Sequence, residues 1–262
     1  MQTGKDITYG GAKYNFSGVQ GIGIANLSDS LYALKKIVFE EKRISFCDLI
    51  KALDSNFYGI ENEKLRVRLI NKYDKYGNDN DEVDNLSSDI LRYYSKSVEK
   101  HVTPRGGTFV PGSYTVSAHI PLGKAVGATP DGRMSGEQLA DGGLSTMVGR
   151  DILGPTAVLK SVSKLDNYLT TNGSLLNVKF SPKTLEGDEG IHKLSDFLFA
   201  FMKLKIQHIQ FNVISADTLK SAQTRPNDYK GLVIRVAGYS AFFIELSREI
   251  QDDIIRRTEH NL

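Results

Sequence analysis

The sequence predicts an α/β fold, because helical and strand patterns follow each other in a clear order. Before about residue 102, apolar residues recur at helical spacing, as at Leu27, Leu31 and Leu34. From residue 103 onward, glycine and proline divide the chain into short runs rich in β-formers. After Leu175 the strand and helix patterns alternate, which is typical of strands joined by helices.

Polar residues at suitable offsets support the helices expected in the first part of the chain. Asn26 or Ser28 can cap the first helix, and Ser45 with Asp48 three residues later forms a capping-box-like pattern at the second. The turn at residues 76–81 lacks the spacing of a calcium loop, so we expect it to cap the fourth helix. The expected helices span residues 27–41, 46–56, 61–71 and 81–101.

The second part of the chain contains runs of both kinds. We expect strands at residues 109–110, 114–120, 157–162, 175–180, 208–214 and 232–236. We expect helices at residues 190–204, 216–224 and 247–257, with Ser215 and Ser247 as caps of the last two. The strings 127–133 and 139–145 have the chemistry of turns, and loops of this kind can carry functional residues.

Composition and charge exclude several classes of protein. With 40% hydrophobic and 24% charged residues, the chain has the make-up of a soluble globular protein. A net charge of +2 gives no strong field for nucleic acid or acidic membranes, and no apolar stretch approaches the ~20 residues of a membrane span. The start, Met1 to Tyr9, lacks the apolar core of a signal peptide, and one cysteine excludes an internal disulfide framework. We therefore expect a cytoplasmic protein with no nucleic-acid or membrane partner.

Several isolated features have a structural interpretation. The glycine-rich stretch 4–26 fits neither a phosphate loop nor a dinucleotide fingerprint. Cys47 is expected to be a small buried hydrophobe, and His208 a core histidine with a bonded ring. His119 has no partner visible in the sequence, and Arg256–Arg257 fits the favourable charge at a helix C-terminus. We expect no metal site.

The string R-V-A-G-Y-S-A-F-F at residues 235–243 is the most informative stretch of the chain. A buried strand leads into it, a tight turn passes through Gly238, and a second apolar run follows. A glycine in such a place ordinarily indicates a bend where no Cβ fits. The full string, however, resembles the C-terminal radical loop of the glycyl radical enzymes, a family that includes pyruvate formate-lyase and the glycerol and propanediol dehydratases.

Further strings extend this resemblance over nearly the whole chain. A-T-P-D-G-R at 128–133 and L-A-D-G-G at 139–143 are similar to the long inner segment of the dehydratase branch. The ending at 251–260 also resembles that of the glycerol and propanediol dehydratases more than that of pyruvate formate-lyase. The chain is thus identified as similar to the C-terminal portion of such an enzyme.

The resemblance implies that Gly238 stores an unpaired electron on its Cα. A flat Cα conjugates with the amide on each side, and only glycine has no Cβ to clash in that geometry. The loop around it would be shaped by Arg235, Val236, Ala237, Tyr239 and Ser240. Tyr114 resembles a residue that reaches the substrate cavity in the dehydratases, although a strand tyrosine with a bonded hydroxyl remains an equal alternative. The family binds no cofactor for this purpose; a separate iron–sulfur activating enzyme that uses S-adenosylmethionine installs the radical.

The implied architecture is the C-terminal half of a ten-stranded α/β barrel of the pyruvate formate-lyase-like type, with the glycine loop in its centre. We expect residues 1–102 to be a helical segment of the barrel shell and residues 103–262 to be a half-barrel with the glycine radical domain. The family's thiyl cysteine lies in a C-x-E motif, but the residue two after Cys47 is Leu49. The chain alone is therefore expected to be incomplete, and an open half-barrel predicts a complementary chain as partner.

Several functions remain open at this point. The leading one is the radical-bearing part of a B12-independent diol dehydratase, a lyase acting on a small hydroxylated substrate under anaerobic conditions. The alternatives are a formate C-acetyltransferase-like protein, a repair module that replaces the damaged loop of a full-length partner, and an inactive fragment.

Overall fold

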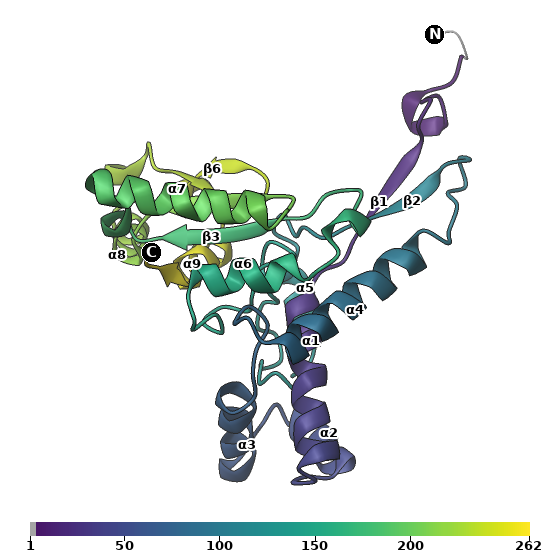
Figure 1. Cartoon of the computed structure of the whole chain (residues 1–262), viewed down its shortest axis with the longest axis vertical. Helices are drawn as coiled ribbons and strands as arrows, with labels where there is room; N and C mark the ends of the chain where they lie inside the picture. The colour runs from purple at the N-terminus through teal and green to yellow at the C-terminus, as the bar shows by residue number, and fades with distance from the viewer. Residues whose placement is uncertain (1–3) are drawn as a thin grey trace.

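The computed structural model describes residues 4–262, so the expectation for the first nine residues lies partly outside it. The chain forms three parts (Figure 1). One end carries a lobe built from the C-terminal half, in which β3 lies beneath α7. Two helical legs, α2 and α3, extend downward, and a narrow ribbon of β1 and β2 projects away on the other side. None of the helices in residues 4–262 is long and apolar enough to cross a membrane.

The helices expected in the first part of the chain are confirmed. They are α1 (Ile24–Leu34), extended by a π-helical turn at Lys35–Glu40, then α2 (Phe46–Asp54), α3 (Ile60–Asn71) and α4 (Asp81–Val98). Ser45 caps α2 by accepting a hydrogen bond of 3.0 Å from the Asp48 amide, as predicted. Asn80 caps α4 by accepting one from the Glu82 amide.

The cap predicted for the first helix is wrong. The helix begins one turn earlier, with Gly23 at φ +88° as its N-cap residue. Asn26 and Ser28 therefore lie inside the helix, where they are buried. Asn26 instead ties α1 to the turn-rich segment, because its amide donates to Asp131 and its oxygen accepts from the Ala140 amide.

The strands form three small sheets. Strands β1 (Phe16–Gln20) and β2 (Thr108–Gly112) pair in parallel, and β3 (Leu176–Phe180) lies between β4 (Ile209–Val213) and β7 (Glu259–His260), again in parallel. A bridge between Ser113 and Ser174 links the end of β2 to the start of β3. The third sheet is an antiparallel hairpin of β5 (Val233–Arg235) and β6 (Ser240–Phe242). The parallel strands thus run as a discontinuous wall from β1 to β4.

Two expected strands are absent from the structure of these residues: one is a helix, and the other is a turn that leads into a helix. Residues 157–162 lie in α6 (Pro155–Ser163), whose first residue is a proline already fixed at a helical φ. Most of this helix is buried, so its β-branched residues reflect packing on several sides and not strand periodicity. Residues 114–120 form a turn that enters α5 (His119–Ala125), where Pro121 sits in the first turn and no amide is lost.

The remaining elements agree with the sequence. They are α7 (Gly187–Lys203), α8 (Ala216–Thr224) and α9 (Arg248–Arg256). Ser215 caps α8 through the Thr218 amide, whereas Ser247 occupies the N-cap of α9 without a side-chain bond. The main core joins α1, α4 and α6 to β3, and a second, smaller core lies beneath the hairpin.

Candidate functional site

The hairpin of β5 and β6 places Gly238 at its tip. Arg235 pairs with Ser240 across the strands, and the Val236 amide donates to the Tyr239 carbonyl at 2.9 Å. Gly238 has a φ of +81°, in the region that favours glycine. A Cβ built on it would meet no heavy atom within 4 Å among the described residues. The expectation of a bend without room for a Cβ is therefore wrong, and the backbone conformation is what selects glycine.

The hairpin is buried on one side and open on the other. Val236 and Ala237 are buried, whereas Gly238 and Ser240 are exposed. Its apolar side chains, including Ile234 and Val236, pack in the smaller core against α8 and α9. The site thus consists of an exposed glycine on a firmly packed base.

The amide of Gly238 begins a chain of polar side chains that leads into the protein. Gln210 of β4 accepts from this amide through Oε1 at 2.9 Å. Its Nε2 donates to Oδ1 of Asn177 on β3 at 2.8 Å. Asn177 in turn donates to a carboxylate oxygen of Asp141 at 2.6 Å. The L-A-D-G-G string therefore lies directly beneath the hairpin.

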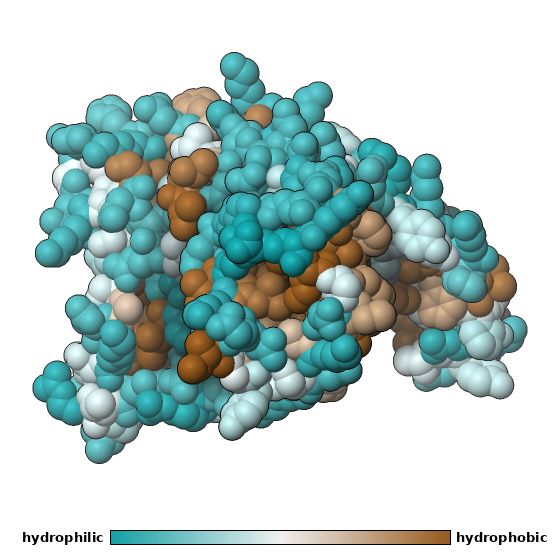
Figure 2. Space-filling view, turned by 90° about the horizontal axis from the view of Figure 1, so that it is seen from below, coloured by the Kyte–Doolittle hydropathy of each residue, from teal (hydrophilic) through white to brown (hydrophobic). Residues whose placement is uncertain are grey.

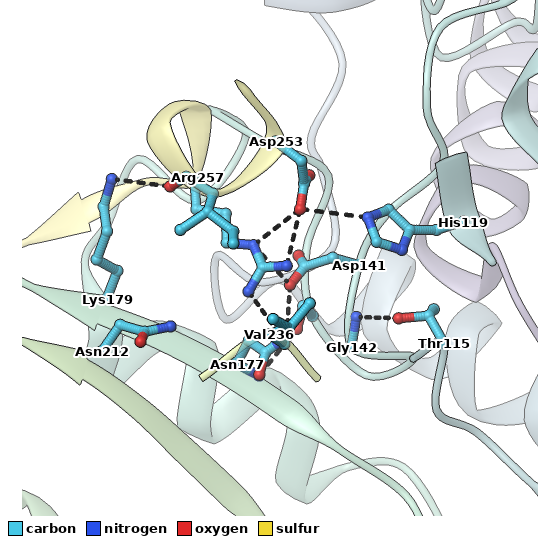
Figure 3. Close-up of polar contacts among 12 residues, drawn as sticks. Thr115, His119, Asp141, Gly142, Asn177, Lys179, Asn212, Val236, Asp253 and Arg257 are labelled. Carbon is cyan, nitrogen blue, oxygen red and sulfur yellow. Dashed lines mark hydrogen bonds and ion pairs between the residues drawn. The ribbon is translucent and has the colours of Figure 1, made fainter. Parts of the chain in front are cut away.

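Arg257 completes this network from the end of α9 (Figure 3). Its guanidinium donates to the Val236 carbonyl at 2.8 Å and lies 3.3 Å from Asp141. It also pairs with Asp253 at 2.7 Å. The interpretation of Arg257 as a simple helix-terminal charge is wrong, because the side chain is only 6% exposed. Arg256 beside it is exposed, as that interpretation expects.

His119 meets the network on its far side. Its Nε2 lies 3.3 Å from a carboxylate oxygen of Asp253, and both side chains are fully buried. The sequence offers no local signal for this pair, because α5 and α9 are distant along the chain. The sequence interpretation therefore missed His119, Asp253, Gln210 and Asn177.

The charge of Asp253 makes this network sensitive to acid. Burial alone would raise its pKa, but Arg257 and His119 hold the pKa well below its ordinary value. Stability from this group is therefore present above the unfolded pKa of about 4 and is lost as the pH falls toward the lower folded value. We expect the free energy of unfolding to fall steeply below about pH 4, and Asp253→Asn to have a shallower slope there. Urea denaturation at several pH values measures both slopes, and equal slopes would contradict the assignment.

The other residues predicted to shape the loop lie in the hairpin or at its tip. Arg235 is held by its backbone, which exchanges two hydrogen bonds with the Asn212 side chain at 2.7 and 3.0 Å. Its guanidinium donates to the Ser240 hydroxyl across the hairpin. Tyr239 is half-buried in the smaller core.

Three isolated predictions have mixed outcomes. Tyr114 lies just after β2 and in no strand, and its hydroxyl accepts a weak hydrogen bond of 3.4 Å from Asn172. His208 is exposed and not in the core, although its Nδ1 lies 3.2 Å from the Ser174 carbonyl. Cys47 is exposed on α2, so its expected burial is wrong.

A small polar cavity lies beneath the network. Its volume is about 30 Å³, which suits a water molecule or two but no organic substrate. Its lining includes Asp141, Asn177, Lys179, Asn212, Arg257 and His260. Within residues 4–262, His, Cys, Asp and Glu side chains form no cluster of three that could hold a metal ion.

Comparisons with known proteins agree with this geometry. Residues 1–123 match the family model "Pyruvate formate lyase-like", and residues 140–244 match "Glycine radical". The chain is 42% identical over 264 residues to (2S)-3-sulfopropanediol dehydratase of Klebsiella oxytoca, covering 99% of this chain and 32% of that protein. It is 41% identical to trans-4-hydroxy-L-proline dehydratase of Clostridioides difficile, covering 99% of this chain and 32% of that protein.

Solved structures give the same result. The glycerol-bound B12-independent glycerol dehydratase from Clostridium butyricum superimposes with a TM-score of 0.94 at 49% identity, over 100% of this chain and 33% of that one. This chain spans about a third of the length of the curated relatives it matches.

Proposed function

This chain belongs to the glycyl radical enzyme family, and on that premise we propose that it is the radical-storing C-terminal portion of a glycyl radical lyase. Its fold is part of the pyruvate formate-lyase-like α/β barrel, as its structural neighbours show. The observation that carries the proposal is the hairpin, which holds Gly238 exposed at φ +81° on a buried base. We place the parent enzyme among the B12-independent dehydratases of the diol and glycerol type, because relatives named for propanediols or glycerol match 96% or more of this chain.

The geometry of Gly238 suits hydrogen abstraction by another protein. A separate iron–sulfur activating enzyme must reach the Cα hydrogen, and the open space around this Cα permits that approach. The residues that shape the loop are Arg235, Val236, Ala237, Tyr239 and Ser240. The radical would be a modification of the chain itself, with no bound cofactor.

The chemistry on substrate is proposed to need a second chain. Cys47 is in α2, which lies far from the hairpin (Figure 1). A partner carrying the N-terminal portion, or a full-length enzyme, would supply the thiyl cysteine and the contacts to a small hydroxylated substrate. The same proposal includes a boundary at residue 102 between a helical shell segment and a half-barrel. It also includes a role for Tyr114 in the substrate cavity of the complete enzyme, and a cytoplasmic, anaerobic setting.

The surface offers a place for such a partner. Seen from below, hydrophobic side chains gather in the middle of the molecule (Figure 2). Exposed apolar residues on α2 and α3 include Phe46 and Ile60, and Tyr58 lies between these helices with 86% of its surface exposed. An open groove of about 840 Å³ lies beside them. Apolar areas of this kind are typical of surfaces that another chain covers.

Oxygen cleavage of the activated chain tests the proposal. After anaerobic treatment with a matching activating enzyme and S-adenosylmethionine, exposure to air is expected to cut the chain at Gly238. Gly238→Ala is expected to remain intact, since a Cβ opposes the flat radical, and alanine at this positive φ is expected to cost about 1–2 kcal/mol of stability. Mass spectrometry measures the cut. The proposal fails if the wild-type chain stays intact both alone and with an N-terminal partner, beside a relative that is cut.

A further inference from the structure

Gln210 connects the exposed glycine to the buried charges. The side chain is 5% exposed and lies on β4, so the sheet holds it in place. Its hydrogen bonds among the described residues go to the amide of Gly238 and to Asn177. It is therefore placed to act on that amide.

The two ends of this hydrogen-bonded series, the Gly238 amide and the Asp141 carboxylate, fix the donor-to-acceptor direction of every hydrogen bond in it. The Gly238 amide can only donate, so the amide oxygen of Gln210 must face it. The Gln210 nitrogen must then face the oxygen of Asn177, and the Asn177 nitrogen must face the Asp141 carboxylate. All three hydrogen bonds point the same way, from the glycine toward a negative charge.

Hydrogen bonds aligned in this way strengthen one another. Each polarised amide is a better acceptor for the next, and a carboxylate at the end gives the largest effect. Asp141 stays fixed there because it lies against Arg257, which also holds the Val236 carbonyl. The two peptides that precede Gly238 are thus each anchored: Arg257 holds the Val236–Ala237 peptide through its carbonyl, and Gln210 holds the Ala237–Gly238 peptide through its amide.

We propose that Gln210 is a positioning residue for the glycyl radical, a role that rests on the proposed function. The hydrogen bond fixes the plane of the peptide that precedes Gly238. It also raises electron density on the Gly238 nitrogen, the atom that donates density to an electron-poor Cα radical. Gln210 and its chain to Asp141 therefore stabilise the radical electronically without touching the Cα.

Two substitutions separate this role from a general effect on stability. Gln210→Met keeps the length of the side chain and removes both hydrogen bonds. Gln207→Met is the matched control, because Gln207 lies just before β4 and its side-chain oxygen accepts from Ser174 and Thr170, away from the hairpin. In the unactivated chain, we expect exchange of the Gly238 amide hydrogen to become about tenfold faster in Gln210→Met and to stay unchanged in Gln207→Met.

The activated protein supplies the electronic test. The chain is labelled with ¹⁵N-glycine and activated together with its N-terminal partner, and the radical is followed by electron paramagnetic resonance. We expect Gln210→Met to change the hyperfine coupling to the Gly238 nitrogen and to shorten the lifetime of the radical. Equal coupling and lifetime in the two variants would overturn the proposal.

A measurement on the wild-type chain covers the case in which Gln210→Met does not fold. Magnetisation transfer across the hydrogen bond, from the Gly238 nitrogen to the Gln210 side-chain carbonyl, is expected in the unactivated protein. Its absence would also overturn the inference. Failure of the proposed function looks different, because no radical would form in the wild type while the exchange and transfer results would still stand.

Discussion

Replacing Arg257 with methionine is expected to lower the free energy of unfolding by about 3–5 kcal/mol. The substitution would leave the carboxylates of Asp253 and Asp141 buried without their cation. It would also remove the hydrogen bond that anchors the Val236 carbonyl. Removing one partner from a buried charge network lowers the free energy of unfolding by more than the intact network adds to it, because the remaining charges stay buried away from water.

Arg256→Met is the matched control for this experiment. Arg256 is exposed and donates to the Gln138 side chain at 2.6 Å, so its loss is expected to cost less than about 1 kcal/mol. Urea denaturation followed by circular dichroism measures both variants. Similar small losses would show that the Arg257 charge is not needed beneath the hairpin. Arg257→Lys keeps the charge without the planar fork and is expected to fall between the two.

Gly143→Ala is expected to destabilise the chain by about 4 kcal/mol or more, or to prevent folding. Gly143 has a φ of +103°, and a Cβ on it would lie 2.2 Å from the Ser113 carbonyl oxygen. This contact joins the L-A-D-G-G turn to the end of β2, where the strand wall continues into β3. Neither backbone can move without breaking the pairing.

Gly136→Ala is the control that separates backbone strain from the steric clash, because it has the first without the second. Gly136 also has a positive φ, +79°, but a Cβ there would meet no described atom within 4 Å. Its substitution is expected to cost about 1–2 kcal/mol, from backbone strain alone. Thermal unfolding of the two variants side by side is the measurement, and a comparable loss in both would contradict the clash.

The sequence predicted those parts of the fold that local chemistry controls. Ser45 and Ser215 cap the helices that were expected from them, because capping depends on residues three apart. The prediction failed at α6, where burial on several sides hides the helical period. It also missed β1, because this short strand has a glycine at its centre, pairs with a partner distant along the chain and shows no apolar alternation of its own.

The string around Gly238 predicts the candidate site, but it does not predict the side chains that hold the hairpin from below. The hairpin around Gly238 is local, so the sequence pattern predicts it. Gln210, Asn177 and Asp253 reach it from separate elements, and no spacing along the chain relates them. The L-A-D-G-G string was the available signal, since Asp141 within it is the point where those contacts converge.

The one-sided anchoring of the hairpin determines how its tip can move. At a φ of +81° the peptide before Gly238 is twisted out of the plane that a flat Cα would require. Gln210 holds that peptide, and Arg257 holds the peptide before it through the Val236 carbonyl. With both held, the twist is removed by rotation about the N–Cα bond of Gly238, which moves the segment from Tyr239 onward. This rotation strains the hydrogen bond from the Val236 amide to the Tyr239 carbonyl. The backbone before Gly238 is therefore fixed and the backbone after it can rotate, and the rotation takes place at the residue proposed to carry the unpaired electron.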